Sequence, residues 1–115
     1  MAEECIFCRI VAGELPADIV YQDEHFLAFR DILPRAPIHV LIIPKTHITS
    51  VAELTNEWQE LAGRLIIIAK NLAEKEGIAK NGYRLVINCG HEGGQLVPHL
   101  HLHLIGGRQL DAKLG

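Results

Sequence analysis

Apolar and polar residues alternate most regularly in a short stretch near the end of the chain. Over residues 99–104, three histidines alternate with three leucines. This is the period of a β-strand, whose successive side chains point to opposite faces of a sheet. The pattern predicts a strand over 98–105, with His99, His101 and His103 on one face and the leucines buried on the other.

Three other apolar runs also predict strands. Residues 19–21 and 26–29 flank a polar turn, which is typical of a β-hairpin. As a strand, residues 39–44 would present apolar side chains on both faces, which favours a central position in the sheet. Residues 83–89 predict a further strand, which precedes a glycine-rich loop and the histidine stretch.

One long amphipathic helix is expected, with Thr55 as its N-cap and Gly77 at its end. Apolar residues with helical spacing form its buried stripe: Trp58, Leu61, Ala62, Leu65, Ile68, Ala69 and Leu72. Residues 5–11 predict a short helix near the N-terminus. Strands in succession with one long helix inserted predict an α+β fold with a mainly antiparallel sheet, formed by residues 1–115 as one domain.

The composition of the chain argues against some classes of binding partner. Hydrophobic residues make up 49% of the 115 residues and charged residues 22%, an ordinary profile for a soluble globular protein. A net charge of −3 argues against a surface for nucleic acid polymers, and the absence of an 18-residue apolar run argues against a membrane span. The acidic start at 1–4 does not resemble a signal peptide, and three cysteines are an odd number, so we expect a reducing cytoplasm.

The cysteines allow two interpretations. Cys5 and Cys8 have the spacing of half a tetrahedral zinc site. The alternative is that they are small residues packed beneath the sheet, because free cysteine is often buried. We expect Cys89 to be a buried thiol, and His25 and His91 to be solvated loop residues.

The spacing of the three histidines limits which ligands they can bind together. Neighbours on one face of a strand are about 6.6 Å apart, so three rings from one strand cannot all reach a zinc ion at about 2.0–2.1 Å. A phosphate is large enough to lie along such a row. The preceding loop, residues 89–95, contains three glycines, whose backbone N–H groups can form an anion-binding nest.

A phosphate site lined by imidazoles favours phosphoryl or nucleotidyl transfer. A neutral histidine can attack phosphorus through one ring nitrogen if the other N–H is held by an acceptor. His101 is the natural nucleophile because it has an imidazole on each side, and those neighbours can donate hydrogen bonds to the phosphate oxygens.

These residues resemble the histidine triad (HIT) family, whose signature is His-φ-His-φ-His-φ-φ, where φ is apolar. The chain is similar to the Hint branch over nearly its whole length, with matching motifs at residues 5–10, 27–32, 36–47, 94–95 and 106–109. The resemblance implies a HIT-like α+β fold and a homodimer. It also implies hydrolysis of purine nucleoside 5′-phosphoramidates, such as adenylated amines, through a nucleotidyl-histidine intermediate and without a catalytic metal.

The resemblance also implies roles for individual residues. His101 would be the nucleophile, surrounded by His39, His99 and His103, and Asp31 would bind the ribose hydroxyls. The apolar slot for the base would consist of Phe7, Ile10, Phe29 and Ile32, with Ile6 contributing. The phosphate would be surrounded by Asn88, Gly94, Gln95 and the Leu96 backbone. Some bacterial relatives complete a structural zinc site with the counterparts of Cys5, Cys8, His47 and His99. From the residues alone, Asp31 is equally a turn residue and Asn88 a polar group at a strand end.

Three departures from the Hint pattern concern substrate specificity. Leu96 stands where a serine near the leaving group is usual, Pro98 replaces an aromatic residue, and the tail 110–115 lacks a tryptophan.

Alternative functions are a dinucleoside polyphosphate hydrolase, a nucleotide-binding regulatory protein with incidental hydrolysis, and a zinc-stabilised interaction protein. The nucleotidyltransferase branch has glutamine where this chain has His103.

Overall fold

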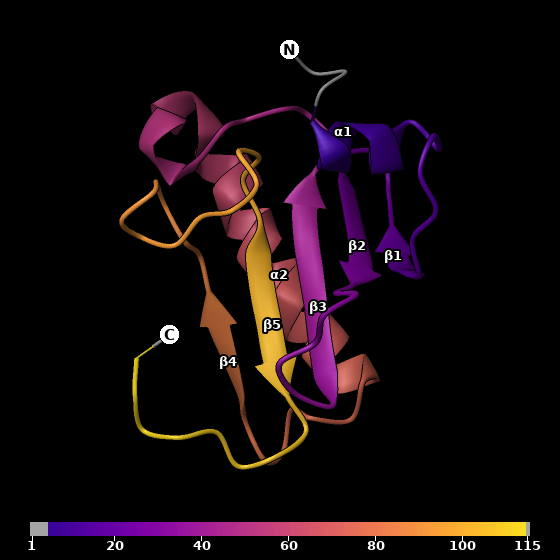
Figure 1. Cartoon of the computed structure of the whole chain (residues 1–115), viewed down its shortest axis with the longest axis vertical. Coiled ribbons are helices and arrows are strands. Elements are labelled where there is room, and N and C mark those ends of the chain that lie inside the picture. The colour runs from indigo at the N-terminus through magenta and orange to yellow at the C-terminus, as the bar shows by residue number, and fades with distance from the viewer. Residues whose placement is uncertain (1–4, 115) are drawn as a thin grey trace.

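Five strands form one antiparallel sheet in the order β1–β2–β3–β5–β4 (Figure 1). The structure is a computed structural model that describes residues 5–114. The strands are β1 (Ile19–Gln22), β2 (Phe26–Arg30), β3 (Ile38–Pro44), β4 (Tyr83–Val86) and β5 (Leu102–Gly106). The predicted hairpin is β1 and β2, and the apolar run of β3 lies at the centre of the sheet, as predicted.

Two α-helices accompany the sheet, α1 (Ile6–Val11) and α2 (Gln59–Lys75). The predicted apolar stripe packs α2 onto the sheet through Leu65, Ile68, Ala69, Leu72 and Ala73. Gly77, with φ of +78°, follows the helix, and the N–H of Ile78 bonds to the carbonyl of Ala73. This is a Schellman ending, so the predicted helix stop is correct.

The predicted start of the long helix is wrong by one turn. Thr55 caps a 3₁₀ turn, η3 (Asn56–Trp58), without a side-chain hydrogen bond to the backbone, and α2 begins only at Gln59. A second 3₁₀ turn, η2 (Val51–Glu53), precedes it. The tighter η3 turn leaves Trp58 partly buried against the main core, which is the packing role that its position in the stripe predicts.

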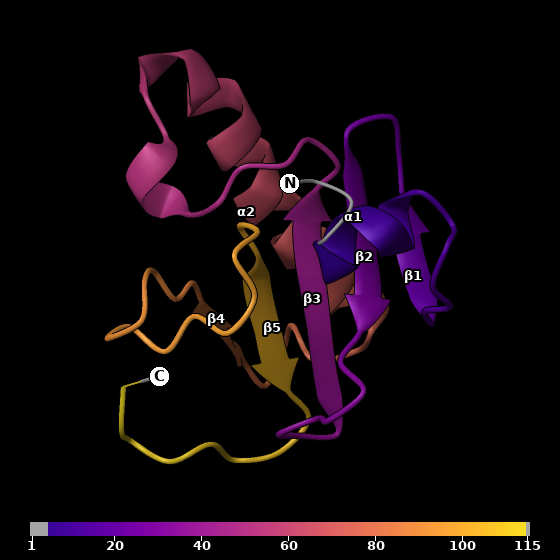
Figure 2. The same ribbon diagram turned by 45° about the horizontal axis from the view of Figure 1, so that its top comes forward.

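The two faces of the sheet carry different clusters of buried residues. On the face toward α2 the sheet contributes Phe26, Ala28, Val40, Ile42, Leu102 and Leu104. On the other face, α1 packs through Cys5 and Phe7 onto Leu27, Phe29, Leu41 and Ile43 (Figure 2). Because side chains alternate along a strand, His39 shares the α1 face with Leu41 and Ile43.

The histidine strand is shorter than predicted. Leu100, Leu102 and Leu104 are each at most 2% exposed, so the burial of the leucines is confirmed. However, β5 begins only at Leu102, and His99 and His101 precede it in irregular backbone. The chain leaves the sheet there because the Leu100 N–H bonds to the Ile48 carbonyl, in the segment after β3, at 2.6 Å.

The predicted strand over 83–89 is also too long, since β4 ends at Val86. Residues 87–89 continue into the glycine-rich loop. Cys89 is therefore exposed, and the prediction of a buried thiol is wrong. His25 and His91 are exposed, as expected.

Among residues 5–114, no helix combines the length and the apolar character needed to cross a membrane.

Candidate functional site

Four histidines meet on the face of the sheet that α1 partly covers. His39 comes from β3, His103 from β5, and His99 and His101 from the segment that enters β5. The ring centroid of His103 lies 5.0 Å from that of His101 and 5.2 Å from that of His39. The four rings are not equally accessible to solvent, since His39, His99 and His101 are buried and His103 is half-buried.

The tautomer of His101 follows from a backbone contact. Its Nδ1 lies 2.7 Å from the carbonyl oxygen of His99. A carbonyl only accepts hydrogen bonds, so Nδ1 carries the proton and Nε2 carries a free lone pair. Phe7 packs edge-on against the ring, with centroids 5.2 Å apart. The arrangement is that of an imidazole nucleophile held in one orientation.

A chain of hydrogen bonds orients His39 and His103. The backbone N–H of Arg35 donates to His39 Nδ1 at 3.0 Å, so a neutral His39 carries its proton on Nε2. That nitrogen lies 2.9 Å from His103 Nδ1 and donates to it. His103 is thereby left with a proton on Nε2, which makes it a hydrogen-bond donor beside His101.

Burial keeps these rings neutral. Desolvation lowers the pKa of His39 and of His99 below the usual value. It lowers the pKa of His103 furthest, to about 4, with further lowering from the neighbouring His101 and His39. Burial therefore favours the neutral forms of His39 and His103 on which their hydrogen bond depends.

Acid is expected to destabilise the fold through His103. Above its ordinary pKa of 6.5 the ring is neutral in both states, but between 6.5 and about 4 only the unfolded chain gains the proton. The free energy of unfolding should fall by about 3 kcal/mol across this window, and no further below it. Urea unfolding at about pH 7 and about pH 4.5 measures this loss.

The variant His103→Asn should lose less stability over the same range, because it lacks the group that titrates. The variant His25→Asn is the matched control, since His25 is exposed on the β1–β2 turn. It should behave as the unmodified chain does. An equal loss in His103→Asn would assign the acid sensitivity to a different group.

Asp31 lies beside the histidines. Its Oδ2 is 3.5 Å from His39 Nε2, while its Oδ1 accepts the backbone N–H of Leu33 at 2.9 Å. The second contact is an Asx turn, so the turn interpretation of Asp31 is correct whatever else the carboxylate binds. Its side chain is 21% exposed and accessible to a ligand.

The residues expected to form the base slot are only partly brought together. Phe7 and Phe29 pack edge-to-face with centroids 5.4 Å apart, and Ile10 packs against the same cluster. Ile32 is 90% exposed, and Ile6 is 51% exposed. The structure thus contains an aromatic floor with two apolar side chains left open to solvent.

The glycine-rich loop is held by two amide side chains. Asn88 Nδ2 donates to the Gly93 carbonyl at 2.8 Å. Gln95 accepts from the N–H of Gly90 and donates to the carbonyl of Thr49 at 2.7 Å. A Cβ at position 93 would lie 2.3 Å from the Cys89 carbonyl oxygen, so only glycine fits there. Both amides shape the loop, and Leu96 after it is 90% exposed.

Next to the triad, Cys5, Cys8, His47 and His99 form a second cluster, whose ligand atoms all lie within 4.8 Å of one another. His99 Nδ1 lies 3.3 Å from Cys5 Sγ and 3.6 Å from Cys8 Sγ, and His47 Nδ1 lies 3.2 Å from Cys8 Sγ. Sulfur and nitrogen ligands in a tetrahedral zinc site are about 3.6 Å apart, given bonds of about 2.3 and 2.0–2.1 Å. The donor set and its spacing fit zinc.

The proton positions fit as well. His99 Nε2 lies 2.9 Å from the Pro44 carbonyl oxygen and donates to it, so its Nδ1 lone pair faces the sulfurs. Desolvation, with the adjacent Cys5 thiol, raises the pKa of Cys8 to about 11. In the metal-free cluster Cys8 is therefore a thiol.

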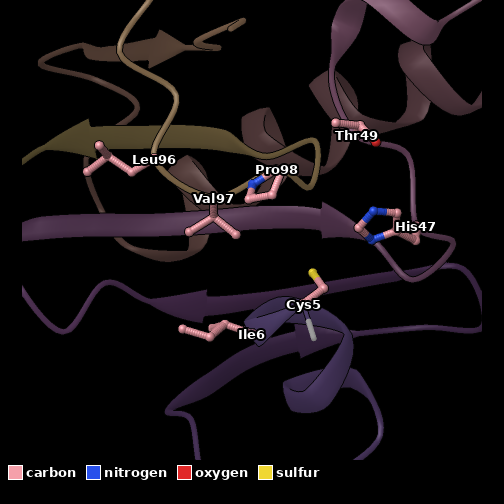
Figure 3. A pocket seen from close by; sticks show the side chains of 7 residues that line it. All are labelled: Cys5, Ile6, His47, Thr49, Leu96, Val97 and Pro98. Carbon is pink, nitrogen blue, oxygen red and sulfur yellow. The ribbon is translucent and has the colours of Figure 1, made fainter. Parts of the chain in front are cut away.

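An open pocket of about 430 Å³ borders this cluster (Figure 3). Cys5 and Ile6 line it from the start of α1, His47 and Thr49 from the segment after β3. Its remaining wall is Leu96–Pro98, the segment that leads into His99. The pocket therefore lies beside the triad, on the side where the two cysteines are.

Comparison with known proteins identifies this arrangement. The HIT domain family model matches residues 12–110. The chain belongs to the HIT family. This confirms the resemblance inferred from the histidine motif, and the sheet, long helix and short helix confirm the predicted HIT-like α+β fold.

Individual HIT proteins are similar over almost the whole chain. The purine nucleoside phosphoramidase of Escherichia coli K12 is 52% identical over 114 residues, covering 99% of this chain and 96% of that protein. A HIT family hydrolase from Legionella pneumophila superposes with a TM-score of 0.94 at 50% identity, covering 96% and 99%. A Zn-bound histidine triad family protein from Mycobacterium smegmatis gives 0.81 at 35% identity, covering 97% and 81%.

Two groups that orient the HIT histidines were missed by sequence reasoning. The Arg35 N–H orients His39, and the Pro44 carbonyl orients His99. Both are backbone groups: every residue type supplies a carbonyl, and every type except proline supplies an N–H, so no residue pattern marks them. Both groups come from segments, the loop 31–37 and the end of β3, that only the folded structure brings next to the histidines.

Proposed function

We propose that this HIT protein is a nucleotidyl hydrolase that cleaves purine nucleoside 5′-phosphoramidates through a nucleotidyl-histidine intermediate. The single observation that carries the proposal is the bond from His101 Nδ1 to the His99 carbonyl, which leaves Nε2 free to attack. The similarity to a purine nucleoside phosphoramidase at 52% identity supports the substrate class.

In the first step, His101 Nε2 attacks the phosphorus and the P–N bond to the amine breaks. The amine leaves with a proton taken from solvent or from a neighbouring donor. His103 Nε2–H donates to a non-bridging phosphate oxygen as negative charge develops there. The His99 carbonyl continues to hold the Nδ1–H of the now positively charged imidazole.

In the second step, water attacks the phosphorus and the P–Nε2 bond breaks. The nucleoside monophosphate is released, the proton of the water passes to solvent, and His101 returns to its neutral tautomer. Two moderate barriers replace a single high one. No metal or other cofactor takes part in either step.

Nucleotide contacts are proposed from the same geometry. Asp31 binds the ribose hydroxyls, and the base lies over the aromatic floor of Phe7 and Phe29 with Ile10. Ile32 and Ile6, whose side chains are exposed in the structure, contact the base when the nucleotide binds. The backbone of the loop formed by Asn88, Gly94, Gln95 and Leu96 surrounds the phosphate.

AMP release from adenosine 5′-phosphoramidate tests the function. We expect turnover, and samples quenched in an alkaline denaturant, in which the P–N bond is stable, should contain AMP bound to His101, identified by peptide mass spectrometry. Turnover should survive treatment with a chelator, at a reduced rate. Binding of AMP without any turnover would instead favour a nucleotide-binding regulatory protein, and turnover of diadenosine polyphosphates alone would favour the dinucleoside polyphosphate hydrolase.

We also infer a structural zinc ion held by Cys5, Cys8, His47 and His99. The spacing of the donors supports it, and a Zn-bound relative from Mycobacterium smegmatis has the same fold at 35% identity. The ion would tie α1 to the sheet. Reduced thiols are needed for this, which supports a cytoplasmic location.

A homodimer is proposed on the β4 edge of the sheet. Within residues 5–114, β4 pairs with a strand on one side only, so its outer edge carries backbone groups that a second copy of the strand can pair with. Ile66 and Ile67, on the outer side of α2, are 51% and 60% exposed. Two-fold pairing would let each copy cover these isoleucines on the other.

The double substitution Ile66→Glu and Ile67→Glu is therefore expected to convert a dimer into a monomer. Charges placed in such an interface would be buried without partners. Light scattering on the eluted protein measures the mass. Ile19→Glu is the matched control, because Ile19 is 43% exposed on the opposite edge strand; it should leave the mass unchanged. A monomeric unmodified chain would refute the proposal.

A further inference from the structure

His99 lies between the cysteine–histidine cluster and the nucleophile. Its ring is fully buried, with Nδ1 facing Cys5 Sγ and Cys8 Sγ and Nε2–H bonded to the Pro44 carbonyl. Its backbone carbonyl accepts the Nδ1–H of His101 at 2.7 Å. The same residue therefore touches the metal-binding cluster with its side chain and orients the nucleophile with its main chain.

The backbone of His99 has few other restraints. It precedes β5, so no sheet hydrogen bonds hold it. Its N–H bonds locally to the Val97 carbonyl, and the following N–H bonds to Ile48, one residue after His47. The position of the carbonyl thus depends on how firmly the ring of His99 and the segment around His47 are held.

The helix α1 provides a second connection between the two sites. It has only six residues, too few for a helix that is stable without tertiary contacts. Phe7 lies between the two cysteines in sequence, and its ring centroid is 5.8 Å from that of His99 and 5.2 Å from that of His101. Whatever holds Cys5 and Cys8 also holds Phe7 against the nucleophile.

We propose that His99 is a positioning residue through which zinc occupancy of the Cys5–Cys8–His47–His99 cluster orients His101. With the ring of His99 coordinated, its carbonyl is held at His101 Nδ1 and the nucleophilic tautomer is the dominant one. With zinc absent, the ring and α1 are released, the carbonyl moves, and His101 samples both tautomers. This inference deepens the proposed function and rests on it and on the proposed zinc ion.

The effect should be larger on the chemical step than on nucleotide binding. The proposed ribose contact, Asp31, lies beyond the end of β2 and outside the cluster, whereas the base contacts Ile6, Phe7 and Ile10 lie on α1 beside the cysteines. A displaced nucleophile is expected to lower kcat by about tenfold to a hundredfold, and the release of α1 to raise KM by a smaller factor.

The experiment compares zinc-loaded protein, chelator-treated protein and chelator-treated protein given Zn²⁺ again, together with the variant His47→Asn. His47 is the exposed ligand and lies outside the triad, so its replacement disturbs the core least. Metal content is measured by mass spectrometry, kcat and KM with adenosine 5′-phosphoramidate, and the His101 tautomer by ¹H–¹⁵N NMR of the imidazole nitrogens. His25→Asn is the matched control, since the His25 side chain is exposed and belongs to neither site.

We expect a single Nδ1–H signal for His101 in zinc-loaded protein and averaged nitrogen shifts in zinc-free protein and in His47→Asn. Adding Zn²⁺ should restore the signal and kcat in the chelated chain but not in His47→Asn. An unchanged tautomer and kcat in zinc-free protein, with only a lower melting temperature, would overturn the proposal, as would a chain that binds no zinc. A zinc-dependent tautomer in a protein without turnover would refute the proposed function and leave the coupling intact.

Discussion

Replacing His101 by alanine is expected to reduce AMP release from adenosine 5′-phosphoramidate by at least about a thousandfold. The ring supplies the attacking nitrogen, and no other imidazole can take its place, because His103 Nδ1 and His39 are occupied by each other. Nucleotide affinity should change little, since the proposed base and ribose contacts come from other residues. Single-turnover kinetics and AMP titration measure the two effects separately.

The matched control is His25→Ala, which removes an exposed imidazole and should keep the unmodified rate. Covalent AMP should also be absent from His101→Ala after quenching in an alkaline denaturant, which preserves the P–N bond in the unmodified chain. A variant that retained more than about a tenth of the rate would contradict covalent catalysis by His101 and would favour direct attack of water on the phosphorus.

Removing zinc is expected to lower the melting temperature by about 16 °C. A ligand present at about a thousand times its dissociation constant stabilises the folded state by about 4 kcal/mol, and each kcal/mol shifts the melting temperature of a domain of this size by roughly 4 °C. The physical reason is that the ion would join α1, which packs on the sheet through Cys5 and Phe7, to His47 and His99. Thermal unfolding followed by circular dichroism, with and without chelator, measures the shift.

Cys8→Ser should show the lower melting temperature already without chelator and should not respond to it. Cys89→Ser is the matched control: Cys89 is an exposed thiol outside the cluster, and its variant should respond to chelator as the unmodified chain does. Equal melting temperatures for the Cys8→Ser and Cys89→Ser variants in the presence of zinc would refute a structural ion at this cluster.

The parts of the fold that the sequence predicts are those set by local periodicity. The alternation of histidine and leucine correctly predicts that Leu100, Leu102 and Leu104 are buried, and the helical stripe correctly predicts which face of α2 packs on the sheet. The ends of the elements depend on contacts from far away in the chain. β5 starts late because Leu100 bonds to Ile48, and α2 starts late because a 3₁₀ turn comes first.

The same distinction applies to the site. The residue types of the triad and of the cysteine pair identify the candidates, and the structure brings His39, His101 and His103 together and gathers the four expected zinc ligands. The tautomers follow from carbonyl and N–H groups that no residue type encodes. Ile32 and Leu96, expected around the nucleotide, are each 90% exposed, because both lie in loops outside the packed core.

The acceptor that orients His101 is a main-chain carbonyl and not a carboxylate side chain. A single codon change can eliminate a side-chain acceptor, but every amino acid at position 99 supplies a carbonyl oxygen, so a point mutation there can displace this acceptor and cannot delete it. A carbonyl is also uncharged, and it attracts the phosphorylated imidazolium less strongly than an anion would. In the proposed mechanism, the carbonyl therefore does not over-stabilise the covalent intermediate, which favours rapid hydrolysis of that intermediate.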